Sequence, residues 1–413
     1  MVKTRFLFLF NRTVFSCLMV CSLAVLAGCG VLRRAERAEA ETLLLTKGRL
    51  GPQASLVRTP GSLVAVYSDR ETTGLYEVEI PASDHLPTVA PTAKLIDRID
   101  MGPPLASTFG EHAMIAHRDT VTVMYLARAA EDKVILKVAS HDVGAAAWTL
   151  DALEPAGNPV AILPAGPDHL DLFWAAGPLL RVTYPGAGSV DSLADPFIPA
   201  DRAGTFGPGL YGGDALDTAT GQVPGQRGVT VYDSISRALL LFRWNGFSYD
   251  KSQIDGAGPV HSSLLLSDGR LAVLSWDPST RRLEMLVQGP NPSRTSKALV
   301  TVSEATSTVA LLPSVFAADQ TSNDGSAVAR ADDRIDRLLY LYDDTSSAGG
   351  GRLRHELSLL APGSGWGLRG YHKYVLQSGE DPIESFSALE DSGWLYVLVH
   401  QGDLKLLRWK LPA

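Results

Sequence analysis

The sequence predicts an all-β fold, a β-propeller of seven four-stranded blades, and three observations lead to it. From Ser55 onward, short runs of Val, Leu, Ile and aromatic residues alternate with Gly, Pro, Asp and Ser, and almost nothing repeats with the helical period. Such runs are typical of strands joined by turns. The runs also fall into similar groups of about 40–55 residues, the length of a propeller blade. Finally, the last group lacks one strand, while one strand-like run near the start belongs to no group.

The clearest group begins at His261. Ser267-Asp268-Gly269 separates two of its apolar runs, and Asp-Gly in that position is a strong hairpin signal. Asp277-Pro278-Ser279-Thr280 predicts the next turn. The group therefore predicts an antiparallel meander of four strands, at 262–266, 271–276, 283–287 and 298–302.

Six further groups follow the same plan. Their predicted strands are 55–57, 63–67, 75–80 and 94–99 in the first group; 112–116, 121–126, 134–139 and 148–153 in the second; 160–163, 169–174 and 179–183 in the third; 229–232, 239–244 and 247–253 in the fourth; 309–312, 338–342 and 353–359 in the sixth; and 386–389, 394–399 and 404–409 in the seventh. The third and fourth groups are irregular, so six or eight blades also fit. A two-sheet sandwich is the alternative, although so many strands would make it unusually large.

The unassigned strand at the start of the domain is Thr42–Thr46, and the seventh group ends without an outer strand. Pairing the two closes the ring and removes the exposed sheet edges that invite aggregation. We therefore expect the propeller domain to span 42–413, with its N-terminal strand completing the last blade.

The first 28 residues have the features of a secretory signal peptide. Lys3, Arg5 and Arg12 precede an apolar run from Val14 to Leu26. That run is shorter than the roughly 20 apolar residues of a membrane-spanning helix. The segment therefore predicts export followed by cleavage.

Leu26-Ala27-Gly28-Cys29 resembles the lipobox of bacterial lipoproteins. The resemblance implies cleavage after residue 28 and attachment of fatty acyl groups, such as palmitate, to Cys29. Two or more acyl chains give stable anchoring. Residues 29–41 would then form a lipidated tether, and their mixed charges are typical of a solvated spacer. Gly30 stands where the inner-membrane retention signal of these proteins would place Asp, which favours the outer membrane of the cell envelope.

Charge and cysteine content exclude several functions. The chain has 37 basic and 45 acidic residues, and removal of the signal peptide changes its net charge from −8 to −11. An acidic domain is poorly suited to nucleic acid. The three cysteines are Cys17, Cys21 and Cys29, so the processed chain would retain no free thiol. Thiol nucleophiles, disulfides and cysteine-ligated zinc are therefore not expected.

Ser55–Arg70 is similar to the opening blade of sialidase-like propellers, and Ser262–Trp276 to a later blade. The resemblance implies a propeller and, if complete, glycan hydrolysis. However, the arginine of the family's Arg-Ile-Pro motif is absent at Pro52-Gln53-Ala54, and no complete Asp-box turn is present. The resemblance thus supports the fold and argues against sialidase chemistry.

Other candidate chemistry has structural explanations. His112 and His117 are five residues apart, which directs them to opposite faces of a strand, so no metal or cofactor site is predicted. The acidic insertion at Ala317–Ile335 could hold calcium, but a solvated loop is favoured. An Asp follows the second strand of several groups, where it would cap the turn by accepting backbone amides. These residues are Asp69, Asp233, Asp277 and Asp343.

The candidate ligand-binding residues lie on two stretches, Phe206–Asp214 and Gly363–Asp381. Both are interpreted as links between blades that border the mouth of the central channel, and the Ala317–Ile335 insertion is expected on the opposite face. Aromatic rings beside cations suit a sugar ring or a partner's side chain. In the second stretch, the alternative is that the aromatic residues pack back over the sixth and seventh blades. The candidates are Phe206, Tyr211, Asp214, Trp366, Arg369, Tyr371, His372 and Tyr374.

Together these features predict a lipid-anchored protein of the bacterial cell envelope, with a propeller that serves as a non-catalytic binding or assembly module. The expected partners are the membrane, through the acyl anchor, and an envelope protein or glycan. Two alternatives remain: a glycan-acting hydrolase that uses channel-mouth carboxylates as acid and base, and a scaffold in outer-membrane protein assembly.

Overall fold

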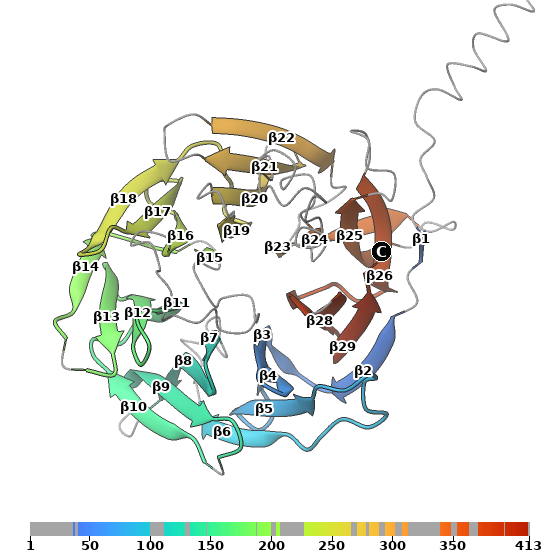
Figure 1. Ribbon diagram of the computed structural model, residues 1–413, viewed down its shortest axis with the longest axis horizontal. Helices are drawn as coiled ribbons and strands as arrows, with labels where there is room; N and C mark the ends of the chain where they lie inside the picture. The colour runs from blue at the N-terminus through green and yellow to red at the C-terminus, as the bar shows by residue number, and fades with distance from the viewer. Residues whose placement is uncertain are drawn as a thin grey trace, which may run out of the picture.

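Short apolar strands and tight turns build seven sheets around a central axis, and their strands are antiparallel except for the short β1 (Figure 1). The computed structural model describes residues 36–37, 40–99, 111–128, 133–145, 147–186, 188–199, 204–206, 227–265, 271–277, 281–288, 294–301, 308–312, 339–347, 353–362, 371–391 and 393–411. Within these ranges the chain forms strands and turns, and no helix there is long and apolar enough to cross a membrane. The architecture is a seven-bladed β-propeller, as the sequence predicts.

The first four blades follow the chain in order. Blade 1 comprises β3 (Leu50–Thr59), β4 (Ser62–Asp69), β5 (Gly74–Pro81) and β6 (Lys94–Arg98); blade 2 comprises β7 (His112–His117), β8 (Thr120–Arg128), β9 (Val134–Asp142) and β10 (Thr149–Leu153). Blade 3 comprises β11 (Asn158–Pro164), β12 (Leu170–Ala175), β13 (Leu179–Tyr184) and β14 (Asp191–Ala194); blade 4 comprises β15 (Gly204–Phe206), β16 (Gly228–Asp233), β17 (Ala238–Trp244) and β18 (Tyr249–Ile254).

The last three blades include both ends of the domain. Blade 5 comprises β19 (His261–Leu265), β20 (Leu271–Asp277), β21 (Arg282–Gln288) and β22 (Arg294–Thr301). Blade 6 comprises β23 (Val309–Leu312), β24 (Leu339–Ser347), β25 (Leu353–Pro362) and β26 (Tyr371–Gly379), with the short β1 (Glu36–Arg37) as a fifth strand. Blade 7 comprises β27 (Ser385–Asp391), β28 (Trp394–Gln401), β29 (Asp403–Lys410) and the N-terminal β2 (Glu41–Thr46).

The ring closes as the sequence predicts. β2 pairs antiparallel with β29, and Leu43 lies opposite Leu406. The N-terminal strand thus supplies the outer strand that blade 7 lacks, so the last blade holds both ends of the domain together. A closed ring leaves no blade without a neighbour on either side.

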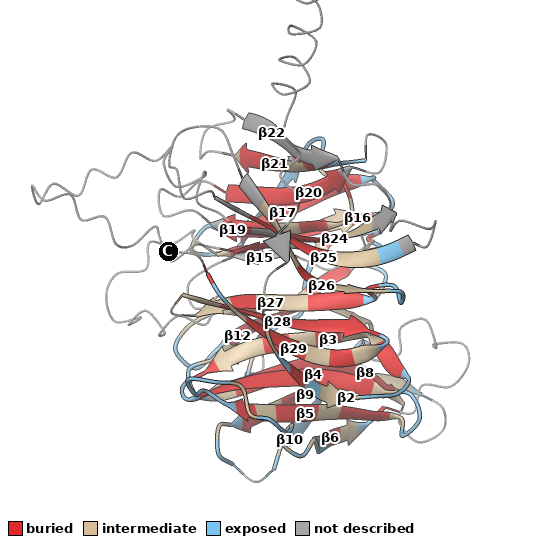
Figure 2. Ribbon diagram, turned by 90° about the vertical axis from the view of Figure 1, so that its right-hand side faces the viewer, coloured by how far each residue is buried: buried red, intermediate tan, exposed pale blue. Residues whose placement is uncertain are grey.

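The core lies between neighbouring blades, because successive side chains of a strand point to opposite faces of its sheet. In β12, Phe173 packs in one buried cluster with Phe242 of blade 4, whereas the adjacent Trp174 packs in another with Val123 of blade 2. Figure 2 shows buried residues concentrated along the middle of the strands. Both faces of a blade are covered, which explains the nearly continuous apolar runs in the sequence.

The inner strands are also joined by side-chain bonds to backbone. The Gln53 side chain accepts a hydrogen bond from the His112 amide at 3.2 Å and donates one to the His112 carbonyl. Ser387 accepts one from the Leu56 amide at 3.1 Å, and Ser262 accepts one from the Leu311 amide at 3.1 Å. These bonds link blades 1 and 2, 7 and 1, and 5 and 6. They satisfy backbone groups of the innermost strands, which have no further strand to pair with on the side of the central axis.

Two faces of the disc can be distinguished from the strand directions. Face A is where the first strand of each blade ends, so the turns between first and second strands and between third and fourth strands lie there. Face B carries the turns between second and third strands and the links between blades. Backbone bonds respect this division: Ala82 donates to Gly61 on face A, and Arg70 donates to Arg49 on face B.

The structure corrects the two predicted inter-blade links. Phe206 is the last residue of β15, the first strand of blade 4, and Tyr371–Gly379 forms β26, the outer strand of blade 6. The ends at Phe206, Pro362 and Tyr371 therefore lie on face A, not on the face of the inter-blade links. β15 has only three residues and β26 is rich in polar residues, so neither has the apolar pattern of a buried strand.

Candidate recognition site on blades 3 and 4

The candidate residues from the sequence are only partly described by the structure. Those outside the described ranges are Cys29, Tyr211, Asp214, Trp366 and Arg369. Phe206 ends β15 opposite Gly228, and the start of β26 holds Tyr371 and His372, opposite Pro362 and Ala361. Their roles in ligand binding stay predictions.

Among these candidates, Tyr374 has a side chain that packs against the neighbouring blade. Its ring lies 4.9 Å from the ring of Trp409 in blade 7, and it packs against the cluster between blades 6 and 7. The neighbouring Lys373 extends to Asp344, with Nζ 3.2 Å from Oδ2. For Tyr374, the structure therefore agrees with the alternative in which the aromatic residues of this stretch cover blades 6 and 7.

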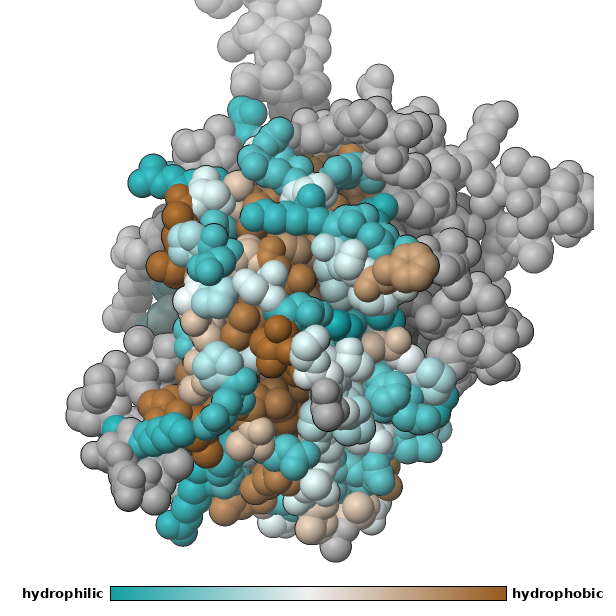
Figure 3. Space-filling view, turned by 90° about the vertical axis from the view of Figure 1, so that its left-hand side faces the viewer, coloured by the Kyte–Doolittle hydropathy of each residue, from teal (hydrophilic) through white to brown (hydrophobic). Residues whose placement is uncertain are grey.

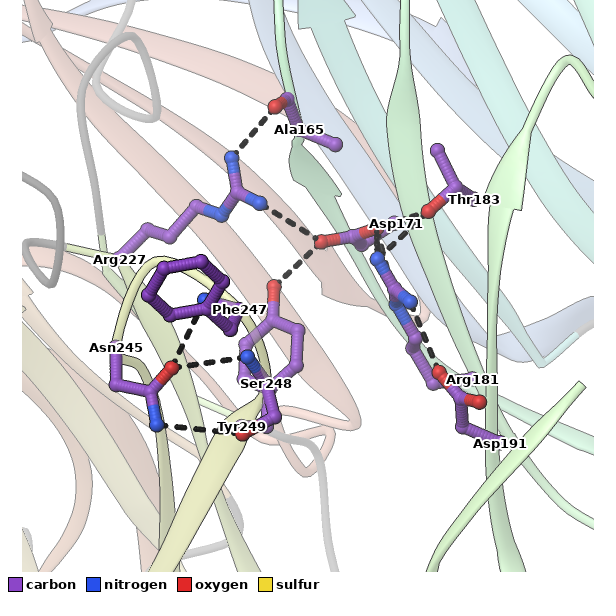
Figure 4. A network of polar contacts seen from close by, with 10 residues as sticks. All are labelled: Ala165, Asp171, Arg181, Thr183, Asp191, Arg227, Asn245, Phe247, Ser248 and Tyr249. Atoms are coloured by element: carbon purple, nitrogen blue, oxygen red, sulfur yellow. Dashed lines mark hydrogen bonds and ion pairs between the residues drawn. The ribbon is translucent and has the colours of Figure 1, made fainter. Parts of the chain in front are cut away.

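A densely connected polar group joins blades 3 and 4 near face A, around the fully buried Asp171 (Figure 4). Asp171 Oδ1 accepts hydrogen bonds from Arg181 Nε at 3.0 Å and Thr183 Oγ1 at 3.0 Å. Asp171 Oδ2 accepts one from the Tyr249 hydroxyl at 2.6 Å and lies 3.3 Å from Arg227 Nη2. One carboxylate of blade 3 thus holds two groups of blade 4, and both of its oxygens are occupied.

The charges in this group determine the protonation states of Arg181 and Tyr249. Burial alone would lower the pKa of the Arg181 guanidinium, but the adjacent Asp171 carboxylate raises it, and so does the bond to Asp191. Burial, followed by the negative charge of Asp171, raises the pKa of the Tyr249 hydroxyl. The phenol therefore remains a hydrogen-bond donor at physiological pH. With its carboxylate saturated and its phenol protonated, this group is a clamp between blades and not an acid–base pair.

Aromatic rings extend the clamp to the end of β17. The Arg227 guanidinium lies 4.7 Å from the centre of the Trp244 ring, and that of Arg181 lies 5.6 Å from the same centre. The Trp244 and Tyr249 rings are 5.1 Å apart, and Tyr249 meets Phe173 edge to face at 5.2 Å. Contacts of this kind between cations and rings hold Trp244 and Tyr249, the residues on either side of the next turn, in one orientation.

That turn, Asn245–Ser248, joins β17 to β18 on face A. Asn245 Oδ1 accepts hydrogen bonds from the amides of Phe247 and Ser248, both at 2.9 Å. Asn245 Nδ2 donates to Asp250 Oδ1 at 2.8 Å, and the Asn245 amide donates to the Ser248 carbonyl at 3.0 Å. Gly246 has a φ of 104°, a conformation that side chains disfavour. The backbone of the turn is thus fixed by its own side chains.

Phe247 stands at the tip of this turn with 92% of its surface exposed. The sequence places it in a strand, but β18 begins at Tyr249, so that prediction is wrong for Phe247. The signal that identifies the turn is Asn245-Gly246 between two aromatic runs, which favours a tight hairpin. Aromatic rings are enriched in protein interfaces, so this exposed ring on a fixed turn is a candidate contact residue.

Exposed apolar side chains occur on both faces and on the rim. On face A, besides Phe247, they are Val89 and Val190; on face B they are Ile198 and Ile235; and on the outer strands they are Leu44, Leu95 and Leu150. Figure 3, which views the ring from the side of blades 3 and 4, shows apolar patches among hydrophilic side chains. Face A carries the two most exposed of these residues, Phe247 and Val89.

Two of the four aspartates predicted to cap turns after second strands, Asp69 and Asp233, do so. For Asp343 the prediction is wrong, because it lies within β24 opposite Leu357 and accepts the Thr308 amide at 3.2 Å. Asp69 Oδ1 accepts the amides of Glu71 and Thr72. Asp233 Oδ1 accepts the amide of Ile235 within its own turn and that of Ile198 in the preceding link. Burial raises the pKa of Asp233, but the bonds from Ser236 and these amides more than offset it, so the net shift is downward. These carboxylates therefore stabilise face B.

Comparison with known proteins identifies the fold. No protein family model and no curated protein matches the sequence. Among solved structures, a catalytically inactive virginiamycin B lyase from Staphylococcus aureus with quinupristin matches with a TM-score of 0.55 and 11% identity, over 91% of this chain and 99% of the lyase. The likeness shows the fold alone.

Two further solved structures align less closely. YCF48 bound to D1 peptide has a TM-score of 0.49 and 11% identity, over 92% of this chain and 98% of that chain. The Aleuria aurantia lectin in complex with α-methyl-L-fucoside has a TM-score of 0.43 and 11% identity, over 82% of this chain and 97% of the lectin.

Proposed function

We propose that this chain is a lipid-anchored protein of the bacterial cell envelope whose propeller binds a protein partner through face A, without catalysis. The observation that carries the proposal is Phe247, 92% exposed at the tip of a turn whose polar groups pair with one another. Burial of such a ring in a partner's pocket would contribute about 1.5–3 kcal/mol.

The chemistry around Phe247 favours a protein over a glycan. A sugar-binding site needs hydrogen-bond donors and acceptors beside the aromatic ring that stacks on the sugar. Here Asn245 is bonded to Phe247, Ser248 and Asp250, and Arg227 is bonded to Ala165 and Asp171. What this turn offers outward is an apolar ring held in one place, which suits a pocket on a protein surface.

The envelope location rests on the N-terminal sequence. A signal peptide followed by Leu26-Ala27-Gly28-Cys29 supports acylation of Cys29, and Gly30 supports the outer membrane. Labelling of growing cells with an alkyne analogue of palmitate tests this assignment. We expect the label on the wild-type chain and none on Cys29→Ala, which should remain unprocessed; equal labelling of both chains would refute anchoring at Cys29.

Photo-crosslinking tests the binding surface. A photoreactive phenylalanine analogue would replace Phe247 on face A and, as the matched control, Ile235 on face B. We expect a protease-sensitive adduct from position 247 and none from position 235. The partner identified in that adduct should no longer co-purify with Phe247→Ala, while Ile235→Ala retains it. Adducts of the same partner from both positions, or a glycan adduct at position 247, would contradict the proposal.

A further inference from the structure

The N-terminal segment leaves the propeller in a defined direction. β1 runs parallel to β26 on the outer edge of blade 6, with Glu36 opposite Tyr374 and Arg37 opposite Val375 (Figure 1). As a fourth strand, β26 runs from face A to face B, so β1 does too. The N-terminal end of β1 therefore points toward face A.

A second attachment gives the same direction. Glu41, the first residue of β2, also lies at the face A end of its strand. Its Oε1 is 2.9 Å from His85 Nδ1, and its Oε2 accepts the Leu86 amide at 2.9 Å. Arg408 Nη1 lies 3.4 Å from Oε2. Even if the two residues of β1 separated from blade 6, the chain would still leave from face A.

The length of the tether limits where an acyl anchor on Cys29 can reach. Six residues separate Cys29 from Glu36, so the tether spans at most about 25 Å. Glu36 lies opposite the fourth residue of β26, which places it about 10 Å inside face A and leaves about 15 Å beyond that face. In the other direction the chain would have to reverse and cover about 17 Å along the rim before it passed face B.

We infer that the anchor holds face A toward the bilayer, so that the partner of Phe247 is a protein segment exposed at the membrane surface, and face B is directed into the compartment. The inference rests on the proposed acylation of Cys29. The lipid itself is a poor partner, because the processed chain would carry a net charge of −11 and anionic headgroups would repel it.

Energy transfer in reconstituted vesicles tests the orientation. The processed chain has no other cysteine, so single-cysteine variants can be labelled specifically. The acylated chain would be placed in phosphatidylethanolamine–phosphatidylglycerol vesicles that carry a headgroup acceptor dye. A donor would be attached at Val89→Cys on face A, which is 77% exposed, or at Ile235→Cys on face B. The faces are about 27 Å apart, so we expect transfer from position 89 to exceed transfer from position 235 about twofold or more.

A lengthened tether is the matched control. Insertion of about 20 Gly and Ser residues after Gly30 makes the link flexible and long, so the difference between the two positions should disappear. Two further measurements distinguish the proposed acyl anchor from the proposed orientation: flotation of the protein with the vesicles, and the mass of the peptide that contains Cys29. Loss of both flotation and the acyl mass would overturn the anchor itself. Normal flotation with equal or stronger transfer from position 235 would overturn the orientation alone.

Discussion

The Asp171 carboxylate of blade 3 accepts a hydrogen bond from the Tyr249 hydroxyl of blade 4 at 2.6 Å. The bond crosses from the sheet of one blade to the sheet of the next, and Arg227, the residue before β16, reaches the same carboxylate. Tyr249 follows directly after the Asn245–Ser248 turn. The position of Phe247 therefore depends on how well blade 3 holds blade 4.

Substitution of Asp171 should destabilise the propeller strongly. Asp171→Ala would remove the counterion shared by the half-buried Arg181 and Arg227, leaving Arg181 only Asp191, at a cost of about 3 kcal/mol in the free energy of unfolding. Tyr249→Phe removes one hydrogen bond and should cost about 1–2 kcal/mol. Urea titration of both variants measures the difference. Equal losses would mean that the carboxylate does not act as the shared counterion.

Removal of the exposed ring should leave the fold unchanged. Phe247→Ala is expected to change the free energy of unfolding by no more than about 0.5 kcal/mol, because the side chain touches little of the protein. Asn245→Ala removes the bonds to the amides of Phe247 and Ser248 and should cost about 1 kcal/mol. Thermal unfolding gives both values. A large loss for Phe247→Ala would assign the ring a structural role instead of recognition.

The sequence predicts the architecture well because each blade repeats the same physical pattern. Asp268-Gly269 predicts a hairpin, and the strands on either side of it, β19 and β20, pair antiparallel. The pairing of Leu43 with Leu406 follows from two unmatched ends of the repeat. The pattern fails where a strand is exposed or very short. β14 (Asp191–Ala194) is largely exposed, and β26 carries polar residues, so neither has the apolar signature of the inner strands.

The candidate site was less predictable for a different reason. Asp171 sits inside the apolar run Leu170–Trp174, and its partners Arg181, Arg227 and Tyr249 are up to 78 residues away in the chain. No local spacing reveals that they converge, because the convergence is produced by the packing of one blade on the next. Phe247 did carry a local signal, the Asn245-Gly246 pair, which indicates a turn and not the start of a strand.

Two glycines of blade 3 should respond oppositely to alanine. A Cβ on Gly157 would lie 2.3 Å from the Ala175 carbonyl oxygen, a backbone atom that cannot move away freely. We expect Gly157→Ala to lower the free energy of unfolding by about 1–3 kcal/mol. A Cβ on Gly166 would meet no atom within 4 Å, so Gly166→Ala should be neutral or add up to about 1 kcal/mol. Urea unfolding of the two variants measures both changes. Equal changes in the free energy of unfolding would contradict the close approach at Gly157.

The buried His400 should make the stability of the propeller depend on pH. Burial lowers the pKa of His400, and the positive charge of Arg70 lowers it further. The negative charge of Glu384, whose Oε2 is 3.6 Å from Nδ1, raises the pKa but does not cancel these effects. The folded chain thus binds this proton less readily than the unfolded chain, whose pKa is near 6.5. Its contribution to stability is complete above about pH 6.5 and is lost as the pH falls from there through the lower folded pKa. Urea unfolding between pH 8 and pH 5 should show this loss, and His400→Gln should reduce it; an unchanged slope would refute the assignment.

Closure of the ring can be tested with two neighbouring residues of β2. Leu43 is 2% exposed and packs toward the core, whereas Leu44 is 38% exposed on the other face of the same strand. Leu43→Asp would bury a charge without a partner and should cost more than about 4 kcal/mol, enough to detach β2 from β29. Leu44→Asp keeps the strand in place and should cost less than about 1 kcal/mol. Limited proteolysis should then cut the N-terminal strand only in the Leu43→Asp variant. Equal resistance of both chains would show that the ring stays closed without this strand.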